Sequence, residues 1–360
     1  MPPIESIREK KEIKGKPIVT STWERLLEKV AIGLAPERFT GIKIVLGVSG
    51  GADSVAMFRL VFDLWNRSPQ FDPCHLVIAH FNHKLRGLES DADQDFTREL
   101  ARSFQLAIHT QDAPTDCLTA MSAGGEAAFR ASRYRFLQQT AEILGARCVL
   151  VAHTADDNIE TMLHHLFRGT GPAGLAAMAP YRPLGDEVVL HRPLLSLRRT
   201  ELRAGLEEIR QNWREDASNL DSRYQRNWLR NELLPMIRNR YPSADDAILR
   251  TIESQSQYRE KLDADAASWI EEHVVCQSNT VTIKRGQIDI ATLCASVRIL
   301  WDRMRWPRQS ITELHQRRIH IAVTCSHSVR FTLPSDVQCN ASEKQVVLTR
   351  GRQATGKVLG

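Results

Sequence analysis

The chain has 360 residues and a formal net charge of +5, with 42% hydrophobic and 25% charged residues. This composition is typical of a globular protein, and the length is sufficient for two domains with separate cores. No apolar stretch is long enough to span a membrane. The seven cysteines include no C-x-x-C pair, which argues against a disulfide framework or a zinc site and favours a cytoplasmic protein.

The first half of the chain alternates short apolar runs with longer amphipathic segments. Residues 1–20 are polar and are expected to form a flexible tail. Strands are predicted at 43–48, 75–81, 106–110 and 148–153, and helices at 52–66, 89–104, 123–145 and 155–167. This alternation predicts an α/β domain over 21–240, built on a parallel sheet that helices cover on both faces.

The pattern changes after residue 168. A Gly- and Pro-rich segment predicts a long loop at 168–185, and Ser196 is a candidate N-cap for the next helix. We expect a mainly helical accessory domain at 241–330, with helices near 244–273 and 291–322. A small β-like segment is expected at 331–360.

The segment SGGADS, residues 49–54, follows the first predicted strand and opens a helix. Ligands of α/β sheets bind at the carboxyl ends of strands, and the two glycines let backbone N–H groups approach an anion. The helix directs its positive end to the same place, and Asp53 can hold a cation that accompanies a polyphosphate. The segment is neither a Walker A loop nor a dinucleotide fingerprint; the alternative is a plain turn capped by Ser49.

Several charged residues are candidates for binding. Asp157 and Glu160 lie three apart on a predicted helix, so they share a face that can hold an ammonium group or a divalent cation; the alternative is an exposed acidic face. Arg223, Arg226 and Arg230 form one stripe of another predicted helix, which can neutralise phosphates or simply face solvent.

Five ordered segments between about residues 40 and 240 resemble one superfamily. SGGADS resembles the S-G-G-x-D-S pyrophosphate loop of N-type ATP pyrophosphatases, also called PP-loop enzymes. The other four are similar to segments of the tRNA(Ile)-lysidine synthetase family: HFNHKLRGLESDADQDF (80–96), GEAAFRASRYRFL (125–137), AHTADDNIETMLHHLFRGTGPAGLAAM (152–178), and RPLL (192–195) together with WREDASNLDSRYQRNWLRNELLP (213–235).

The resemblance implies a PP-loop ATP pyrophosphatase domain over 21–240 and a ligase that forms a carbon–nitrogen bond. ATP, with Mg²⁺, would adenylate C2 of cytidine 34 in the CAU anticodon of tRNA(Ile), and the ε-amine of L-lysine would then form lysidine. The implied ATP-binding residues are Ser49, Gly50, Gly51, Ala52, Asp53, Ser54, His80 and His153. The implied lysine-binding residues are Arg133, Asp157 and Glu160, and the implied tRNA-binding residues are Arg86, Arg223, Arg226 and Arg230.

Catalytic roles are implied for Asp53, which is also the Mg²⁺ candidate, and for Arg226 and Arg230. The sequence does not separate these two arginines, and it identifies no base for the lysine amine. The alternatives are a PP-loop tRNA thiolase, which would want reactive cysteines, and a non-catalytic RNA-binding protein on the same scaffold. The region after 241 can hold tRNA, mediate a homodimer or stabilise the fold.

Overall fold

The computed structural model describes residues 21–69, 71–84, 87–114, 126–215, 225–307 and 311–351. The chain forms two compact units, Met1–His164 with Met178–Leu249 and His165–Ala177 with Arg250–Gly360. The domain limits expected from the sequence, 1–20, 21–240, 241–330 and 331–360, remain predictions.

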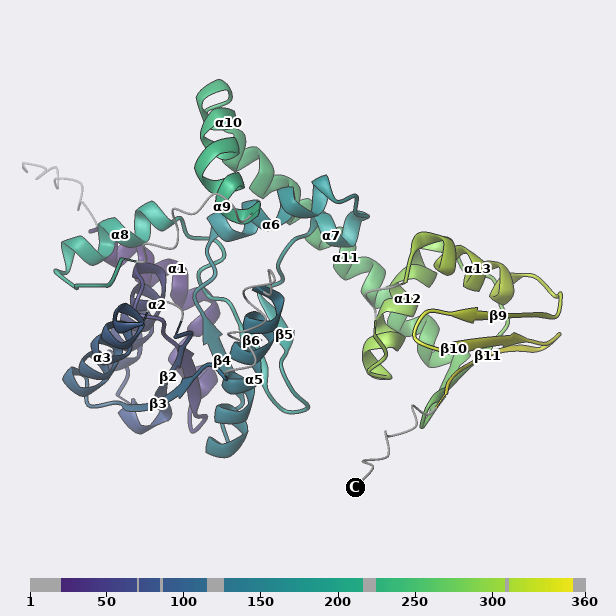
Figure 1. Ribbon diagram of the computed structural model, residues 1–360, viewed down its shortest axis with the longest axis horizontal. Coiled ribbons are helices and arrows are strands. Elements are labelled where there is room, and N and C mark those ends of the chain that lie inside the picture. The colour runs from purple at the N-terminus through teal and green to yellow at the C-terminus, as the bar shows by residue number, and fades with distance from the viewer. Residues whose placement is uncertain are drawn as a thin grey trace, which may run out of the picture. The chain divides into compact units, whose positions relative to one another are not determined.

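The first unit is built on a six-stranded sheet with the order β3-β2-β1-β4-β6-β5 (Figure 1). Its strands are β1 (Ile44–Gly47), β2 (Leu76–Asn82), β3 (Ala107–Asp112), β4 (Cys148–Val151), β5 (Tyr181–Pro183) and β6 (Val189–His191). All neighbouring pairs are parallel except β5 with β6, which is antiparallel at one edge. The expected α/β fold class is confirmed, and the strand order brings the carboxyl ends of β1, β2 and β4 to one edge of the sheet.

Helices follow the strands as the periodicity predicted. Those described up to residue 249 begin with α1 (Thr22–Leu34), η1 (Pro36–Phe39), α2 (Ala52–Asn66), η2 (Pro73–His75), α3 (Leu88–Ser103), α5 (Glu126–Leu144) and α6 (Ala155–Phe167). They continue with α7 (Pro172–Leu175), α8 (Arg199–Glu208), α9 (Gln225–Trp228), the π-helical segment η4 (Leu229–Leu233) and α10 (Leu234–Arg240).

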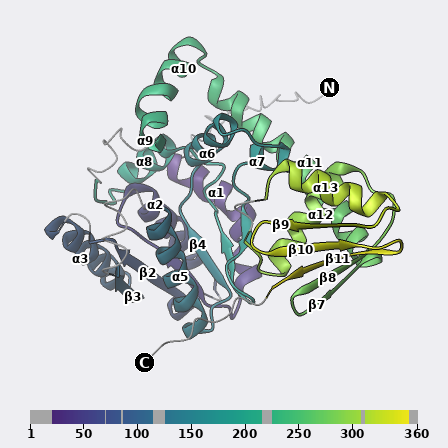
Figure 2. The ribbon, with the colours of Figure 1, turned by 45° about the vertical axis from the view of Figure 1, so that its right-hand side comes forward.

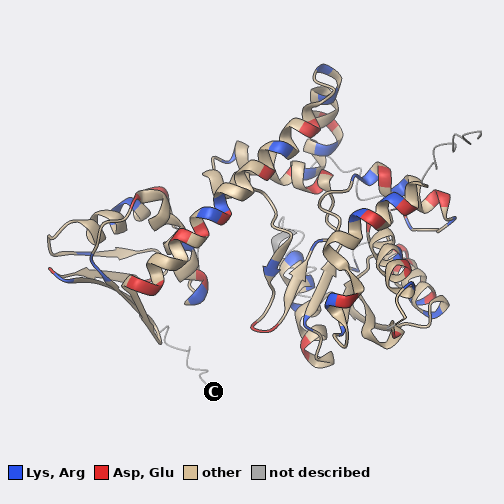
Figure 3. Cartoon of the chain, turned by 180° about the vertical axis from the view of Figure 1, so that it is seen from behind, with Lys and Arg blue, Asp and Glu red and all other residues tan. Residues whose placement is uncertain are grey.

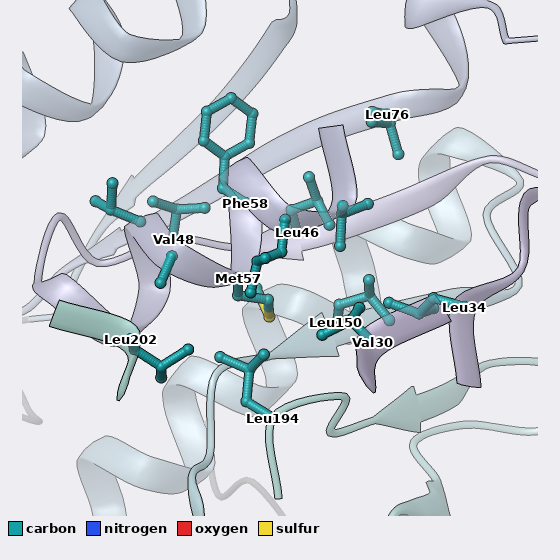
Figure 4. Close-up of a cluster of buried hydrophobic side chains, with 14 of the residues drawn as sticks. Val30, Leu34, Leu46, Val48, Met57, Phe58, Leu76, Leu150, Leu194 and Leu202 are labelled. Carbon is teal, nitrogen blue, oxygen red and sulfur yellow. The ribbon is translucent and has the colours of Figure 1, made fainter. Parts of the chain in front are cut away.

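Both faces of this sheet carry a hydrophobic core. Leu46 of β1 and Leu150 of β4 belong to a core shared with α1, α2 and α8 (Figure 4). Val45 and Val149 point to the opposite face, where they meet α5. Because side chains alternate between faces, strands buried on both sides have no polar positions, which explains their continuous apolar runs. Each fully buried side chain of this size stabilises the fold by about 1.5–3 kcal/mol.

The segment after α6 differs in detail from the expectation. The predicted loop at 168–185 contains the short helix α7 and the edge strand β5. Ser196 is not the N-cap of the next helix; α8 begins at Arg199, and Arg198 is its N-cap. Glu201 accepts a hydrogen bond from the backbone N–H of Arg198 at 2.9 Å, so the first turn supplies its own cap two residues later than predicted.

The second unit combines helices with an antiparallel sheet. The boundary between the units falls within α11 (Ala244–His273), along which acidic and basic positions are interspersed (Figure 3). The unit also contains β7 (Val274–Gln277), β8 (Thr280–Lys284), α12 (Ile290–Arg303), α13 (Glu313–Thr324), β9 (Val329–Leu333), β10 (Val337–Ala341) and β11 (Gln345–Arg350). The single helix expected near 291–322 is thus two helices.

The five strands of this unit have the order β7-β8-β11-β10-β9 (Figure 2). One face packs its buried residues, among them Ile283, Val337 and Leu348, against Trp301 of α12 and Ile319 of α13. The β-like character expected near the end of the chain therefore belongs to a larger sheet that starts at β7. Of the helices in the described ranges, none combines the length and hydropathy needed to cross a membrane.

Candidate active site

The loop between β1 and α2 is held in a defined shape by its two serines. The Ser54 hydroxyl donates to the Gly51 carbonyl at 2.9 Å and accepts from the Ser49 N–H at 3.1 Å. Gly50 has a φ of +95°, a conformation that residues with a Cβ rarely adopt. Gly51 is the N-cap of α2 and provides no side-chain cap, so the first N–H groups of the helix, at Ala52 and beyond, are suited to an anion.

Residues distant in sequence brace this loop. The N–H of Arg214 donates to the Gly50 carbonyl at 2.9 Å, and the Arg214 guanidinium pairs with Asp93 at 2.9 Å. His80, at the end of β2, lies beside the residue that leads into the loop, with its Nδ1 at 2.9 Å from the Val48 carbonyl. Burial lowers the pKa of His80, so its imidazole is neutral, and its Nε2 is buried with no partner among the described residues.

Three carboxylates and two arginines form what we call the acidic cluster: Asp53, Asp157, Glu160, Arg199 and Arg230. Arg199 Nε donates to Asp53 at 3.1 Å, its Nη1 donates to Glu160 at 3.0 Å, and its Nη2 donates to Asp157. Arg230 grips Glu160 with two hydrogen bonds, of 2.7 Å from Nε and 2.9 Å from Nη2. The α2 start and the α6 acidic pair are thereby joined through one guanidinium.

The local sequence explains how α6 presents its two acids. Asp157 accepts from the N–H and the hydroxyl of Thr154, both at 2.9 Å, so it caps the start of the helix. Glu160 follows three residues later on the same face and is 1% exposed. A carboxylate buried this deeply requires cationic partners, which the two arginines supply.

Burial and neighbouring charges shift the pKa values of Asp53 and Asp157 in opposite directions. Burial raises the pKa of Asp53; Arg199 opposes this rise, and Asp157 adds to it. Burial also tends to raise the pKa of Asp157, but Arg199 and the hydrogen bonds from Thr154 hold it below its ordinary value. Asp157 is therefore the firmly ionised member, whereas Asp53 depends on a nearby cation for its charge.

A second group of charges, which we call the cationic cluster, surrounds Tyr134 of α5. Its members are Arg130, Arg133, Arg182 and Arg192. The guanidinium carbons of the first three lie 5.3, 5.3 and 4.5 Å from the centre of the Tyr134 ring. Arg192, directly after β6, is 5% exposed and donates to the Ala179 carbonyl at 2.6 Å and to His153 Nδ1 at 3.3 Å.

His153 lies within the influence of both clusters. Burial lowers its pKa to about 3; Asp157 counteracts this effect, and Arg133 and Arg192 add to it. The imidazole is therefore neutral near pH 7, and it accepts the hydrogen bond from Arg192 through Nδ1. It follows β4 and adjoins both groups, since Arg192 donates to it and the next residue, Thr154, donates to Asp157.

The structure brings some of the predicted site residues together and places others elsewhere. The phosphate loop, Asp157, Glu160 and Arg230 come together, and Arg226 lies beside them with its Nη2 donating to Thr161 at 2.9 Å. Arg133 belongs instead to the cationic cluster. Arg86 and Arg223 lie outside the described residues.

Two residues central to this geometry, Arg199 and Arg192, were missed from the sequence. Arg199 is the second of two consecutive arginines and the first residue of α8, and its partner Asp53 lies 146 residues away. Arg192 directly follows an apolar strand, a position at the edge of the sheet where ligands bind. Two signals pointed to it: that position, and its place at the start of the RPLL segment (192–195) that resembles the family, although no role was assigned to it.

The acidic cluster has the donor chemistry that a divalent cation needs. Carboxylate oxygens are the ligands that Mg²⁺ prefers, and Asp53 stands at the start of the helix that faces the phosphate loop. The Arg199 guanidinium already occupies a cationic position between Asp53 and the α6 acids. The residues present therefore fit a bound cation, with Asp53 as its nearest ligand to the loop.

A known protein family matches the part of the chain that carries this site. The PP-loop domain family matches residues 20–237, more than half of the chain. The fold and the loop after β1 therefore define a PP-loop protein.

The curated relatives narrow this class. The chain is 38% identical over 315 residues to the tRNA(Ile)-lysidine synthase of Rhodopirellula baltica, covering 78% of this chain and 79% of that protein. It is 40% identical to the enzyme of the same name from Geobacter sulfurreducens, covering 59% of this chain but 44% of the relative. The chain belongs to the tRNA(Ile)-lysidine synthase family, and it spans less than half the length of several members.

Among solved structures, the U34-tRNA thiolase NcsA from Methanococcus maripaludis with its [4Fe-4S] cluster is similar in fold. The TM-score is 0.53 at 16% identity, covering 65% of this chain and 79% of that chain. This similarity concerns the fold alone.

Proposed function

We propose that the chain is a tRNA(Ile)-lysidine synthase that uses ATP, L-lysine and tRNA(Ile) with a CAU anticodon. The C2 oxygen of cytidine 34 attacks the α-phosphate of ATP, and pyrophosphate leaves. The ε-amine of lysine then attacks C2 and expels AMP, which leaves lysidine in the tRNA. The enzyme forms a carbon–nitrogen bond, as a ligase does.

The acidic cluster is the observation that carries this proposal. Three carboxylates face two guanidinium groups, so its formal charge is −3 + 2 = −1. A partly buried site with more carboxylates than guanidinium groups favours a further cation. The amine of lysine supplies such a charge directly beside the phosphate loop.

The loop supplies the first half of the reaction. N–H groups at the start of α2 and the positive end of that helix stabilise the charge that develops on the departing pyrophosphate. A divalent cation held by Asp53 would add positive charge near the phosphates. Arg226 and Arg230, which both reach α6, line the approach to the acid pair and are suited to the tRNA phosphates or the target base.

The second step of the reaction, attack by the ε-amine of lysine, depends on where the enzyme holds the lysine. Asp157 and Glu160 share one face of α6 and hold the amines, so the ε-amine is brought to the activated base without a separate encounter. An ammonium must lose its proton before it attacks. The ionised Asp157 orients the amine for this step but is a weak base because its pKa is lowered, so the proton passes to another acceptor, which the sequence does not identify.

The position of the cysteines disfavours the thiolase alternative. Of the cysteines described in the first unit, Cys74 precedes β2 and Cys148 begins β4, so both lie at the amino ends of strands. The acidic cluster lies at the carboxyl ends. Burial also raises the pKa of Cys148 to about 12, which removes it as a thiolate nucleophile.

The test is incorporation of labelled lysine into unmodified tRNA(Ile) in the presence of ATP and Mg²⁺. Wild-type protein should label the tRNA, and Asp53→Asn should lower the rate by about 10²–10³-fold because a charge beside the reacting phosphates is lost. Asp95→Asn, on the exposed side of α3, is the matched control and should label normally.

Three results would contradict the proposal in different ways. Splitting of ATP to AMP without lysine transfer would retain the adenylation step and point to another nucleophile, sulfur first. Binding of tRNA without any use of ATP would favour the non-catalytic RNA-binding alternative. Equal rates for the wild type and Asp53→Asn would remove Asp53 from the mechanism. A tRNA-holding role for the second unit and a homodimer remain predictions.

A further inference from the structure

The cationic cluster contains buried groups whose interactions are incomplete. Arg192 is 5% exposed, and it donates to the Ala179 carbonyl and to the His153 imidazole rather than to an acid. The Tyr134 hydroxyl and Arg133 Nε are buried without a hydrogen-bond partner among the described residues. Tyr134 is itself 9% exposed. Arg192, the Tyr134 hydroxyl and Arg133 Nε are therefore neighbouring buried groups that can each make a further hydrogen bond.

The charges make this arrangement costly. Four guanidinium groups surround one phenol, and within the described ranges none of the four pairs with a carboxylate. Like charges in a poorly solvated environment repel one another, and a buried cation without a counterion loses its hydration. An anion bound here would remove both penalties, and guanidinium groups match the planar geometry of a carboxylate.

The location of the cluster identifies the anion. His153 accepts a hydrogen bond from Arg192, and its chain neighbour Thr154 donates to Asp157, so His153 adjoins both clusters. A ligand that spans this histidine would place a negative group among the arginines and a positive group at the α6 acids. Among the proposed substrates, the amino acid carries both charges on one small molecule. The phosphate loop, in contrast, is built from β1 and α2, which contribute nothing to the cationic cluster.

We propose that Arg192 and Tyr134, together with Arg133, bind the α-carboxylate of the amino-acid substrate and thereby fix the reach of its side chain toward the acidic cluster. This inference rests on the proposed function and adds two residues to the lysine-binding set implied by the family resemblance. Arg192 is the principal ligand because it is buried and held in place by Ala179 and His153. The Tyr134 hydroxyl donates the additional hydrogen bond.

The experiment compares L-lysine with L-lysinamide, in which a neutral amide replaces the carboxylate. Binding of each to the full-length protein, with ATP present, is measured by isothermal titration calorimetry. Wild-type protein should prefer lysine by at least about 30-fold, in line with charge-assisted hydrogen bonds from two donors. Arg192→Met should reduce this preference by about ten-fold, and Tyr134→Phe by about three-fold.

Three further variants keep the test decisive. Arg192→Lys retains the charge and should keep part of the preference, which also covers the case in which Arg192→Met folds poorly. Arg102→Met, an exposed arginine on α3, should bind both ligands as the wild type does. Arg130→Met should have a smaller effect than Arg192→Met because Arg130 is half-buried and lies over the ring face.

The outcomes separate this inference from the proposed function. An unchanged lysine-to-lysinamide ratio in Arg192→Met would overturn it. A selective loss of ATP affinity in the same variant would also overturn it and assign the cluster to a phosphate. If the wild type discriminates, the variants do not, and no lysine reaches the tRNA, the carboxylate site stands and the proposed reaction fails.

Discussion

The acidic cluster pairs each of its carboxylates with a guanidinium, whereas the cationic cluster holds four guanidinium groups around one phenol. Both lie in the first unit, at the end of the sheet where β4 and β6 finish, and His153 is influenced by both. In the acidic cluster Arg199 and Arg230 act as internal counterions. In the cationic cluster the counterion is missing from the described side chains.

This difference shows two ways to keep charge in a binding site. Internal counterions stabilise the empty site, and an incoming cation has to compete with them or share their carboxylates. A cluster of like charge destabilises the empty site, and the ligand itself relieves the repulsion. Removing one arginine from each cluster should therefore have unequal consequences.

The largest effect is expected for Arg199→Met. Three carboxylates lose a shared cation, and Glu160, although still paired with Arg230, is buried. We expect the free energy of unfolding at pH 7 to fall by about 3 kcal/mol. Urea denaturation provides the measurement. Arg67→Met, which breaks an exposed pair with Glu24, is the control and should cost less than about 1 kcal/mol. Equal losses in the two variants would show that the acidic cluster is not stabilised from within.

The next effect concerns pH and the cationic cluster. Burial tends to raise the pKa of Tyr134, but Arg133, Arg130, Arg192 and Arg182 outweigh it and lower the pKa to about 8 from an ordinary value of 10.0. Between these values the unfolded chain binds more protons, so the contribution of Tyr134 to stability grows as pH rises and is lost as pH falls through about 8.

Wild-type protein should therefore gain about 2 kcal/mol relative to Tyr134→Phe between about pH 8 and pH 10. Urea unfolding across this range measures the difference, and ultraviolet absorbance of tyrosinate reports the ionisation directly. Bound lysine should move the ionisation back to higher pH because its carboxylate repels the phenolate. A wild type and a variant with parallel pH profiles would show that the four arginines do not act on the phenol.

The smallest effect is expected for Arg192→Met. The variant loses the hydrogen bond to Ala179 but relieves the repulsion and desolvation of a buried cation. These contributions oppose each other, so the free energy of unfolding should change by less than about 1 kcal/mol. A loss as large as that in Arg199→Met would indicate an internal counterion for Arg192 and would remove the contrast between the clusters.

The strands of the first unit were predictable because a buried strand consists almost entirely of apolar residues. A parallel strand covered on both faces, such as β1 or β4, is apolar at every position and therefore shows as a continuous apolar run. The phosphate loop was recognisable because close backbone approach at Gly50 requires particular residues in a fixed order. Local physics alone determines both features.

The pairing of charges was not predictable, because it depends on contacts across the fold. Arg230 was expected to face phosphate or solvent, yet it makes two hydrogen bonds to Glu160, 70 residues earlier. Nothing in the neighbourhood of Arg199 indicates that Asp53 is its partner. The sheet of the second unit was incompletely foreseen for a similar reason, since β8 pairs with β11 more than 60 residues later.

Arg230 lies in the π-helical turn η4, which determines where this helix can lose a residue. In η4 the N–H of Leu234 bonds to the carbonyl of Leu229, five residues back, so one turn holds an extra residue. The wide turn absorbs the extra residue, so loss of a single residue here would restore an ordinary α-helix and leave Arg226 and α10 in nearly their present phase. Loss of a residue from α10 itself, where every turn is already regular, would rotate the residues that follow by about 100°. The one deletion that this helix can absorb is therefore located in η4.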